Sequence, residues 1–221
     1  ATQLDQRFAA DLQQRYGRMF AQMDRWLALR RAARAAAAQR NWAAAQALAS
    51  QALSLEAQDV GEDSPYLPLA QAYAGEGQHD RMLLTLGEYA HRGGHDPQAL
   101  RTLAAAWYAA GRHDEAIEVL DSINYIAPFD ASLHGELGDW LLQAGRAADA
   151  LGEYRTALAL NPPDGPSAHL RLARAHYALH DLLAARREVL AALEIAPNFR
   201  PAQQLLLQLT AAPPSAHQEE P

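Results

Sequence analysis

The chain has 221 residues, of which 49% are hydrophobic and 7% aromatic, and its frequent alanines and scarce β-branched residues favour packed helices over sheets. It has no cysteine, and all 19 of its basic residues are arginine, which excludes disulfides, thiolate metal sites and catalytic cysteines or lysines. The net charge of −7 combines +4 for residues 1–58 (eight arginines, four acids) with −11 for the remainder (11 arginines, 22 acids), and argues against nucleic acid as the main partner.

An amphipathic helix is predicted for residues 1–25, with Gly17 as a candidate break. Its apolar residues recur at intervals of three and four, at Leu4, Phe8, Leu12, Tyr16, Phe20, Met23 and Leu27, which is the spacing of one helical face. Three interpretations stay open: the helix packs on the rest of the chain, it forms an arm for dimerisation or partner docking, or it lies on a membrane surface. No apolar run reaches the about 18 residues that a transmembrane helix needs.

Two less regular helix pairs are predicted next, in residues 26–58 and 63–96. In the first, "WLALRRAARAAAAQ" predicts one helix and "RNWAAAQALASQALSLEAQD" a second, with Ala45 and Ala52 at its small positions. The second pair has helix and turn signals at Leu69, Ala70, Tyr73 and Gly77. Its later helix departs from a regular pattern, because Met82 stands where a small residue is expected and no proline ends it.

The middle of the chain contains a 34-residue repeat. The stretch "AAGRHDEAIEVL" (109–120) has a near-echo in "QAGRAADALGEY" (143–154). Matched residues of the two copies are 34 apart, at Gly111 and Gly145, Ala116 and Ala150, and Pro128 and Pro162. Residues 97–130 and 131–164 each predict an apolar helix, a turn at glycine, a second amphipathic helix and an end at proline, because glycine tolerates left-handed backbone and proline lacks the amide that continues a helix.

A third copy is predicted for residues 166–199. It matches the others at Leu172, Ala173, Ala185, Ala192 and Pro197. It begins one residue late, and His180 stands where the turn glycine belongs, so its turn is expected to be tighter or differently made. The small residues predicted to be buried where two helices of a unit touch are Ala116, Ala150 and Ala185.

Two further segments complete the chain. Residues 200–210 predict a capping helix that covers the last repeat through Leu205, Leu206 and Leu209. Residues 211–221 are polar and rich in proline, a composition typical of a disordered tail.

These units resemble tetratricopeptide repeats (TPRs), helix–turn–helix units of 34 residues. The fullest copy of the family pattern comprises Leu137, Gly138, Gly145, Ala150, Tyr154, Ala157 and Pro162. The resemblance implies an all-α TPR-type helix–turn–helix solenoid, a right-handed superhelix with an N-terminal helical extension and a C-terminal capping helix. Its parts are an N-terminal helix (1–25), an atypical first repeat (26–58), a degenerate repeat (63–96), three repeats (97–130, 131–164, 166–199), a capping helix (200–210) and a tail (211–221).

No motif in the sequence points to catalysis. "GEGQHD" lacks the third glycine of a dinucleotide-binding motif, "GPSAH" is not a nucleophile elbow, and no His-Glu-x-x-His occurs. His169, His176 and His180 share one helical face, and His91 and His95 are four residues apart. Packed histidines explain this spacing, and a metal site needs further converging ligands. We therefore expect no enzymatic activity, no bound metal and no cofactor.

The resemblance also implies a concave groove, lined by the first helix of each unit and suited to a peptide or a partner helix. The residues at groove-facing positions from which we expect partner contacts are Arg30, Arg34, Gln71, Arg101, Tyr108, Asp139, Arg174 and Tyr177. Arginine and tyrosine often anchor interfaces, and the arginines favour an acidic partner; as ordinary solvated charges they would contribute little. The lysine-and-asparagine clamp with which some family members hold a C-terminal carboxylate is absent.

The sequence thus predicts a non-catalytic protein–protein interaction scaffold, acting in the assembly of a larger bacterial complex. An alternative is the C-terminal TPR portion of a larger envelope protein, such as a zinc peptidase, because "ALEIAPNFRPAQQLLLQL" and "INYIAPFDASLHGELGDWLL" resemble the ends of such chains. Cysteine-free chains suit the cytoplasm and the periplasm alike, so both compartments stay open.

Overall fold

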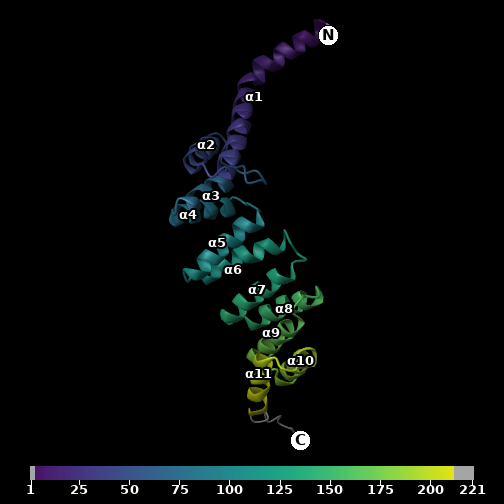
Figure 1. Cartoon of the computed structure of the whole chain (residues 1–221). Helices are drawn as coiled ribbons and strands as arrows, with labels where there is room; N and C mark the ends of the chain where they lie inside the picture. Colours follow the sequence, from purple (N-terminus) through teal and green to yellow (C-terminus); the bar gives the residue numbers. More distant parts are fainter. Residues whose placement is uncertain (1–2, 212–221) are drawn as a thin grey trace. The chain divides into compact units, whose positions relative to one another are not determined.

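The computed structural model of the chain describes the backbone of residues 3–211 and the side chains from residue 21 to residue 211. Between residues 3 and 211 it contains eleven helices and no strand (Figure 1), which confirms the expected all-α fold. The helices belong to two compact units, Ala1–Ala106 and Trp107–Pro221. The tail expected from residue 211 lies outside the described residues, apart from Ala211 at the end of the last helix.

The first unit begins with a single long helix, α1 (Gln3–Ala38), which continues through Gly17 without the break that the sequence suggested. The predicted N-terminal helix and the first helix of the atypical repeat are therefore one element. Helix α2 lies beside the C-terminal half of α1, and the rest of α1 extends beyond it (Figure 1). The side chains of residues 21–25 are all exposed, whereas the apolar residues expected between 4 and 20 fall outside the described side chains.

Small residues bring the helices of the first unit together. The remaining helices of this unit are α2 (Trp42–Leu55), α3 (Tyr66–Gly75), α4 (His79–His91) and most of α5 (Pro97–Ala109). The buried members of two clusters that join α1, α2 and α3 are Ala33, Ala49 and Leu69 in one and Ala36, Ala37, Ala45 and Ala72 in the other. Because alanine ends at Cβ, the helix backbones approach closely and leave few voids.

The second unit contains the regular repeats. Its helices after the end of α5 are α6 (His113–Asn124), α7 (Ala131–Gln143), α8 (Ala147–Ala159), α9 (Gly165–Ala178), α10 (Leu182–Ile195) and α11 (Arg200–Ala211). Helix α11 packs on the last pair through Ala202 and Leu205, which share a buried cluster with Leu170, Ala173 and Val189. The predicted capping helix is thereby confirmed.

The turns between paired helices have one geometry throughout. The residues with left-handed backbone in these turns are Arg40, Gly77, Gly111, Gly145 and His180, with φ between 57° and 80°. After His180, the amide of Asp181 donates to the carbonyl of His176 at 2.9 Å, as the amide of Arg146 donates to Leu141 at 2.8 Å. The expectation of a different turn at His180 was wrong, since the histidine adopts the conformation that glycine takes elsewhere, a conformation that side chains disfavour.

The small positions of the repeat are at its tightest contacts. Ala116, Ala150 and Ala185 have no exposed surface, as the sequence predicted. Gly138 is equally constrained, because a Cβ atom there would lie 2.4 Å from the ring of Tyr154. The phenol ring of α8 therefore lies directly against the backbone of α7.

Replacing Ala150 with leucine should destabilise the second unit by about 1–3 kcal/mol, because the larger side chain would overpack a contact with no free space. Ala148→Leu on the same helix is the matched control, since Ala148 is exposed and its replacement should change stability by less than about 0.5 kcal/mol. Denaturant unfolding of both variants measures the difference. Equal stability of the two variants would contradict the assigned register of the repeat.

Candidate partner-binding site

A cleft of about 380 Å³ lies between α7, α8 and α9 of the second unit. The residues that line it are Asp139, Leu142, Gln143, Tyr154, Ser167, Leu170, Arg171 and Arg174. Most of these side chains are polar or charged, so the cleft suits a ligand that makes hydrogen bonds or carries charge.

Asp139 organises one wall of this cleft. Its carboxylate accepts hydrogen bonds from Arg171, at 3.1 Å from Nε and 2.8 Å from Nη2, and from the Tyr154 hydroxyl at 2.8 Å. Burial, followed by the negative charge of Asp139, raises the pKa of Tyr154, so the phenol keeps its proton and donates. Asp139 was expected to contact the partner, but in this structure its carboxylate binds two groups of its own chain.

Arg174 and Tyr177 are the predicted contact residues that α9 exposes. Arg174 lines the cleft, its side chain is exposed, and no acidic side chain among residues 21–211 pairs with it. Tyr177 follows three residues later on α9 and is 40% exposed. Asp139 balances the charge of Arg171. Arg174 therefore gives the cleft a net charge of about +1.

Tyr108 is fixed by aromatic neighbours in the second unit. Its ring stacks on Trp140 with centroids 4.3 Å apart and meets the ring of His113 edge-on at 4.4 Å. Its hydroxyl donates to Gln143 at 2.7 Å, and Gln143 lines the cleft. Tyr108 therefore supports the edge of the cleft, although it is not among the lining residues.

The first unit has a cleft of different character. It measures about 320 Å³, lies between α3, α4 and α5, and includes Gln71 from α3 and Thr102 from α5. Its apolar lining residues are Leu67, Ala70, Ala74, Met82, Leu86 and Ala99. Arg101 is the neighbour of Thr102 on α5 and is partly buried.

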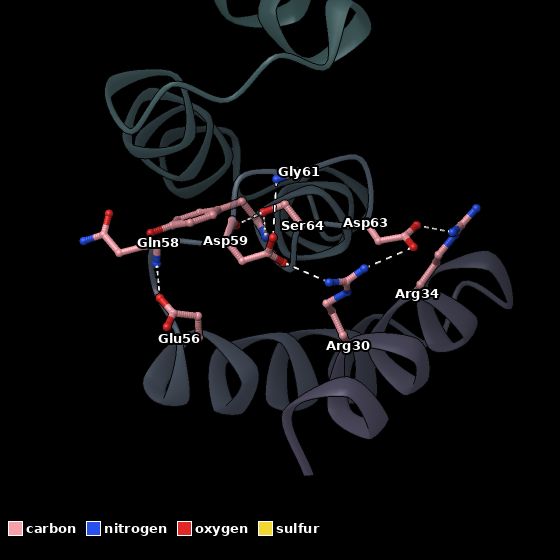
Figure 2. Close-up of polar contacts among 9 residues, drawn as sticks. Arg30, Arg34, Glu56, Gln58, Asp59, Gly61, Asp63 and Ser64 are labelled. Atoms are coloured by element: carbon pink, nitrogen blue, oxygen red, sulfur yellow. Dashed lines mark hydrogen bonds and ion pairs between the residues drawn. The ribbon is translucent and has the colours of Figure 1, made fainter. Parts of the chain in front are cut away.

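The other two predicted arginines hold a loop of their own chain. Residues 56–65 connect α2 to α3, and Figure 2 shows Arg30 of α1 between two carboxylates of this loop. Its guanidinium lies 3.3 Å from Asp59 and 3.2 Å from Asp63, and Arg34 pairs with Asp63 as well. The Ser64 hydroxyl donates to the carbonyl of Asp59 at 2.6 Å, which fixes the loop internally. Arg30 and Arg34 are thus engaged within the chain.

Sequence reasoning missed several residues of these sites. Arg171 and Ser167 lie on α9, one repeat after the predicted Asp139 on α7, and the acids Asp59 and Asp63 lie in the loop between α2 and α3. Arg171 could have been found by comparing repeats, because it stands where the repeat of residues 97–130 has Thr102, which lines the equivalent cleft of the first unit. The loop acids leave no periodic signal.

Two of the histidines that share a helical face in the sequence, His169 and His176, each lie beside an acidic side chain. The Nδ1 atom of His169 lies 2.9 Å from Glu188, and that of His176 lies 3.3 Å from Asp181. Across residues 21–211, no three histidine or acidic side chains converge as a metal site would require. Of the helices that the structure describes, none is long and apolar enough to cross a bilayer.

The chain belongs to the tetratricopeptide repeat family. The sequence profile of the tetratricopeptide repeat matches residues 67–131 and 136–201, which together make up more than half of the chain. No protein of curated function matches the chain in sequence.

Several solved structures have a similar fold. YrrB, described as a TPR protein with an unusual peptide-binding site, is 14% identical over 78% of this chain and 87% of its own, with a TM-score of 0.58. A MamA protein is 16% identical over 77% of this chain and 91% of its own, with a TM-score of 0.55. MamA from Desulfovibrio magneticus RS-1 is 21% identical over 69% and 86%, also at 0.55. These likenesses support the helical-repeat fold.

Replacing Asp139 with alanine should destabilise the second unit by about 1–3 kcal/mol, because the buried Tyr154 hydroxyl would lose its acceptor. Asp149→Ala is the control: Asp149 pairs with Arg146 at 2.8 Å and both side chains are more than half exposed, so its loss should cost less than about 1 kcal/mol. Thermal unfolding of the two variants measures this contrast. An Asp139→Ala variant as stable as the wild type would show that the carboxylate has no organising role.

Proposed function

We propose that this protein is a non-catalytic scaffold that binds a segment of a partner protein in the α7–α8–α9 cleft. The observation that carries the proposal is Arg174, a guanidinium in a polar cleft with no acidic partner among the described side chains. Membership of a family of helical repeats supports it, because stacked helix pairs offer extended binding surfaces.

The partner segment is acidic in this proposal. A carboxylate of the segment accepts hydrogen bonds from Arg174, and the planar guanidinium can engage it through two parallel bonds. Tyr177 buries its ring against the segment, since arginine and tyrosine anchor many interfaces. Asp139 and Tyr108 position the cleft, Asp139 through Arg171 and Tyr154 and Tyr108 through Gln143.

The first unit makes a separate contribution. Gln71 at its cleft and Arg101 on α5 are proposed to contact partner protein as well, with the apolar lining receiving an uncharged side chain. Arg30 and Arg34 are left out of direct binding, because Asp59 and Asp63 already occupy them. Their role in this proposal is to hold the loop between α2 and α3 in place.

Assembly of a larger complex is the setting that we propose for this scaffold. The long helix α1 offers a second surface, because it extends beyond α2 (Figure 1) and its residues 21–25 are exposed. Pairing of α1 with a second copy or with a partner helix is the competing account of how this chain binds, and the experiment below separates the two.

The double change Arg174→Ala/Tyr177→Ala should weaken binding of the partner segment at least about tenfold, because it removes both proposed anchors. Binding is measured by calorimetry, with the segment prepared as a purified peptide from a partner first captured by the wild-type chain. The affinity of the wild type should also fall with added salt, since the contact is between exposed charges.

Two controls decide between the cleft and the N-terminal helix. Arg155→Ala removes the same charge from an exposed site on α8 and should leave the affinity unchanged. A chain shortened to begin at Asp24 should still bind. If the shortened chain loses binding while the Arg174→Ala/Tyr177→Ala variant keeps it, α1 is the binding surface and the cleft is not.

A further inference from the structure

His134 is a buried histidine with hydrogen-bond partners on both sides of its ring. It lies on α7 and is 7% exposed. Its Nδ1 atom is 2.7 Å from a carboxylate oxygen of Glu153 on α8, and its Nε2 atom is 3.0 Å from the backbone carbonyl of Pro128. Pro128 belongs to the loop between α6 and α7, so one imidazole connects this loop to α7 and α8.

These two contacts determine the protonation state of the ring. A carboxylate and a backbone carbonyl only accept hydrogen bonds, whereas a neutral imidazole carries one N–H donor and one lone pair. Either neutral tautomer would therefore set a nitrogen lone pair against an oxygen lone pair at about 3 Å. Only the imidazolium cation, with a proton on each nitrogen, makes both bonds.

We infer that His134 is held as an imidazolium that fastens the α6–α7 loop to α8, so that the anchoring of this loop depends on pH. When the ring loses a proton, one of the two bonds must break. The bond to the carbonyl of Pro128 is the weaker one, because its acceptor is uncharged. Loss of the proton therefore releases the loop while the contact with Glu153 persists.

The charges around the ring agree with this assignment. Desolvation by burial works against the cation, but the hydrogen bonds to Glu153 and Pro128 and the negative charges of Glu153 and Asp130 outweigh it and raise the pKa of His134 above its ordinary value of 6.5. A raised pKa means that the stabilisation is complete below about pH 6.5 and is lost as the pH rises through the value of the folded chain. The loop is therefore anchored in mildly acidic solution and released as the pH rises through the raised pKa of His134.

The neighbouring repeats show that this arrangement is specific to one unit. In the next unit His169 and Glu188 hold the equivalent positions with Nδ1 2.9 Å from the carboxylate, but no hydrogen bond to its Nε2 occurs within residues 21–211, so a neutral ring satisfies this pair. In the preceding unit the same positions hold Leu100 and Val119. An apolar pair thus fits this site of the repeat, and the charged pair is not needed for the fold.

The fastened loop presents two aromatic side chains. Tyr125 is 87% exposed and Phe129 is 84% exposed, and the carbonyl that His134 holds belongs to Pro128, directly before Phe129. Protonation of one buried ring therefore fixes the backbone that carries the two most exposed aromatic residues of the described chain.

The protonation state can be observed directly in the wild-type chain. Nuclear magnetic resonance with ¹⁵N-labelled histidine should show protons on both ring nitrogens of His134 at about pH 6.5, where only about half of the histidines of the unfolded chain carry both protons. Glu153→Gln keeps the shape of the partner and should lower the pH at which the ring deprotonates. A ring that carries a single proton at about pH 6.5 would overturn the inference.

A second measurement follows the loop itself. Amide hydrogen exchange of Ile126, Ala127 and Asp130, whose amides donate to backbone carbonyls, should lose protection in the wild type as the pH rises above about 6.5, after correction for the intrinsic pH dependence of exchange. In His134→Leu/Glu153→Val, which copies Leu100 and Val119, protection should not vary with pH. His169→Leu/Glu188→Val is the matched control and should behave as the wild type does. Protection that is independent of pH in the wild type would contradict a protonated anchor.

Discussion

The second unit depends on how closely its paired helices approach each other. Ala150 and Ala185 have no exposed surface, and Gly138 has no room for a Cβ atom beside Tyr154. This close contact sets the position of Tyr154, whose hydroxyl holds Asp139, which in turn holds Arg171. The geometry of the cleft therefore derives from the absence of side-chain atoms at a few positions, and the polar residues are arranged around that contact.

The two clefts show how one repeat can carry different chemistry. Gln71 in the first unit and Asp139 in the second occupy equivalent repeat positions, and so do Thr102 and Arg171. The first cleft is mostly apolar, whereas the second contains an aspartate with three donors around it and a further arginine. Packing constrains the small positions of the repeat, but it leaves the lining positions free to vary, so the lining decides what each cleft can bind.

Much of the fold could be predicted because its signals are local. Alanine, glycine and leucine at fixed intervals specify the helix pairs and the capping helix, since each interval concerns neighbours on one or two helices. His180 was misjudged because backbone strain at one residue is outweighed by the hydrogen bonds of the whole turn. The partners of the predicted contact residues within the chain could not be predicted in this way. Asp139 binds Arg171, 32 residues away, and Arg30 binds Asp59, 29 residues away. Such pairings depend on the path of a loop or the angle between helices, which no periodic pattern encodes.

The complete absence of lysine gives the two charged features of the second unit separate responses to their surroundings. An arginine side chain stays charged at any pH that the chain would meet, so the electrostatic attraction of the cleft around Arg174 is constant. The imidazolium of His134 is the group that can be discharged, and it acts on the loop that carries Tyr125 and Phe129. A change in acidity would therefore alter how firmly the aromatic loop is held while the positive charge that Arg174 brings to the cleft stayed the same, so the anchoring of the loop and the local attraction of the cleft for a carboxylate are controlled independently.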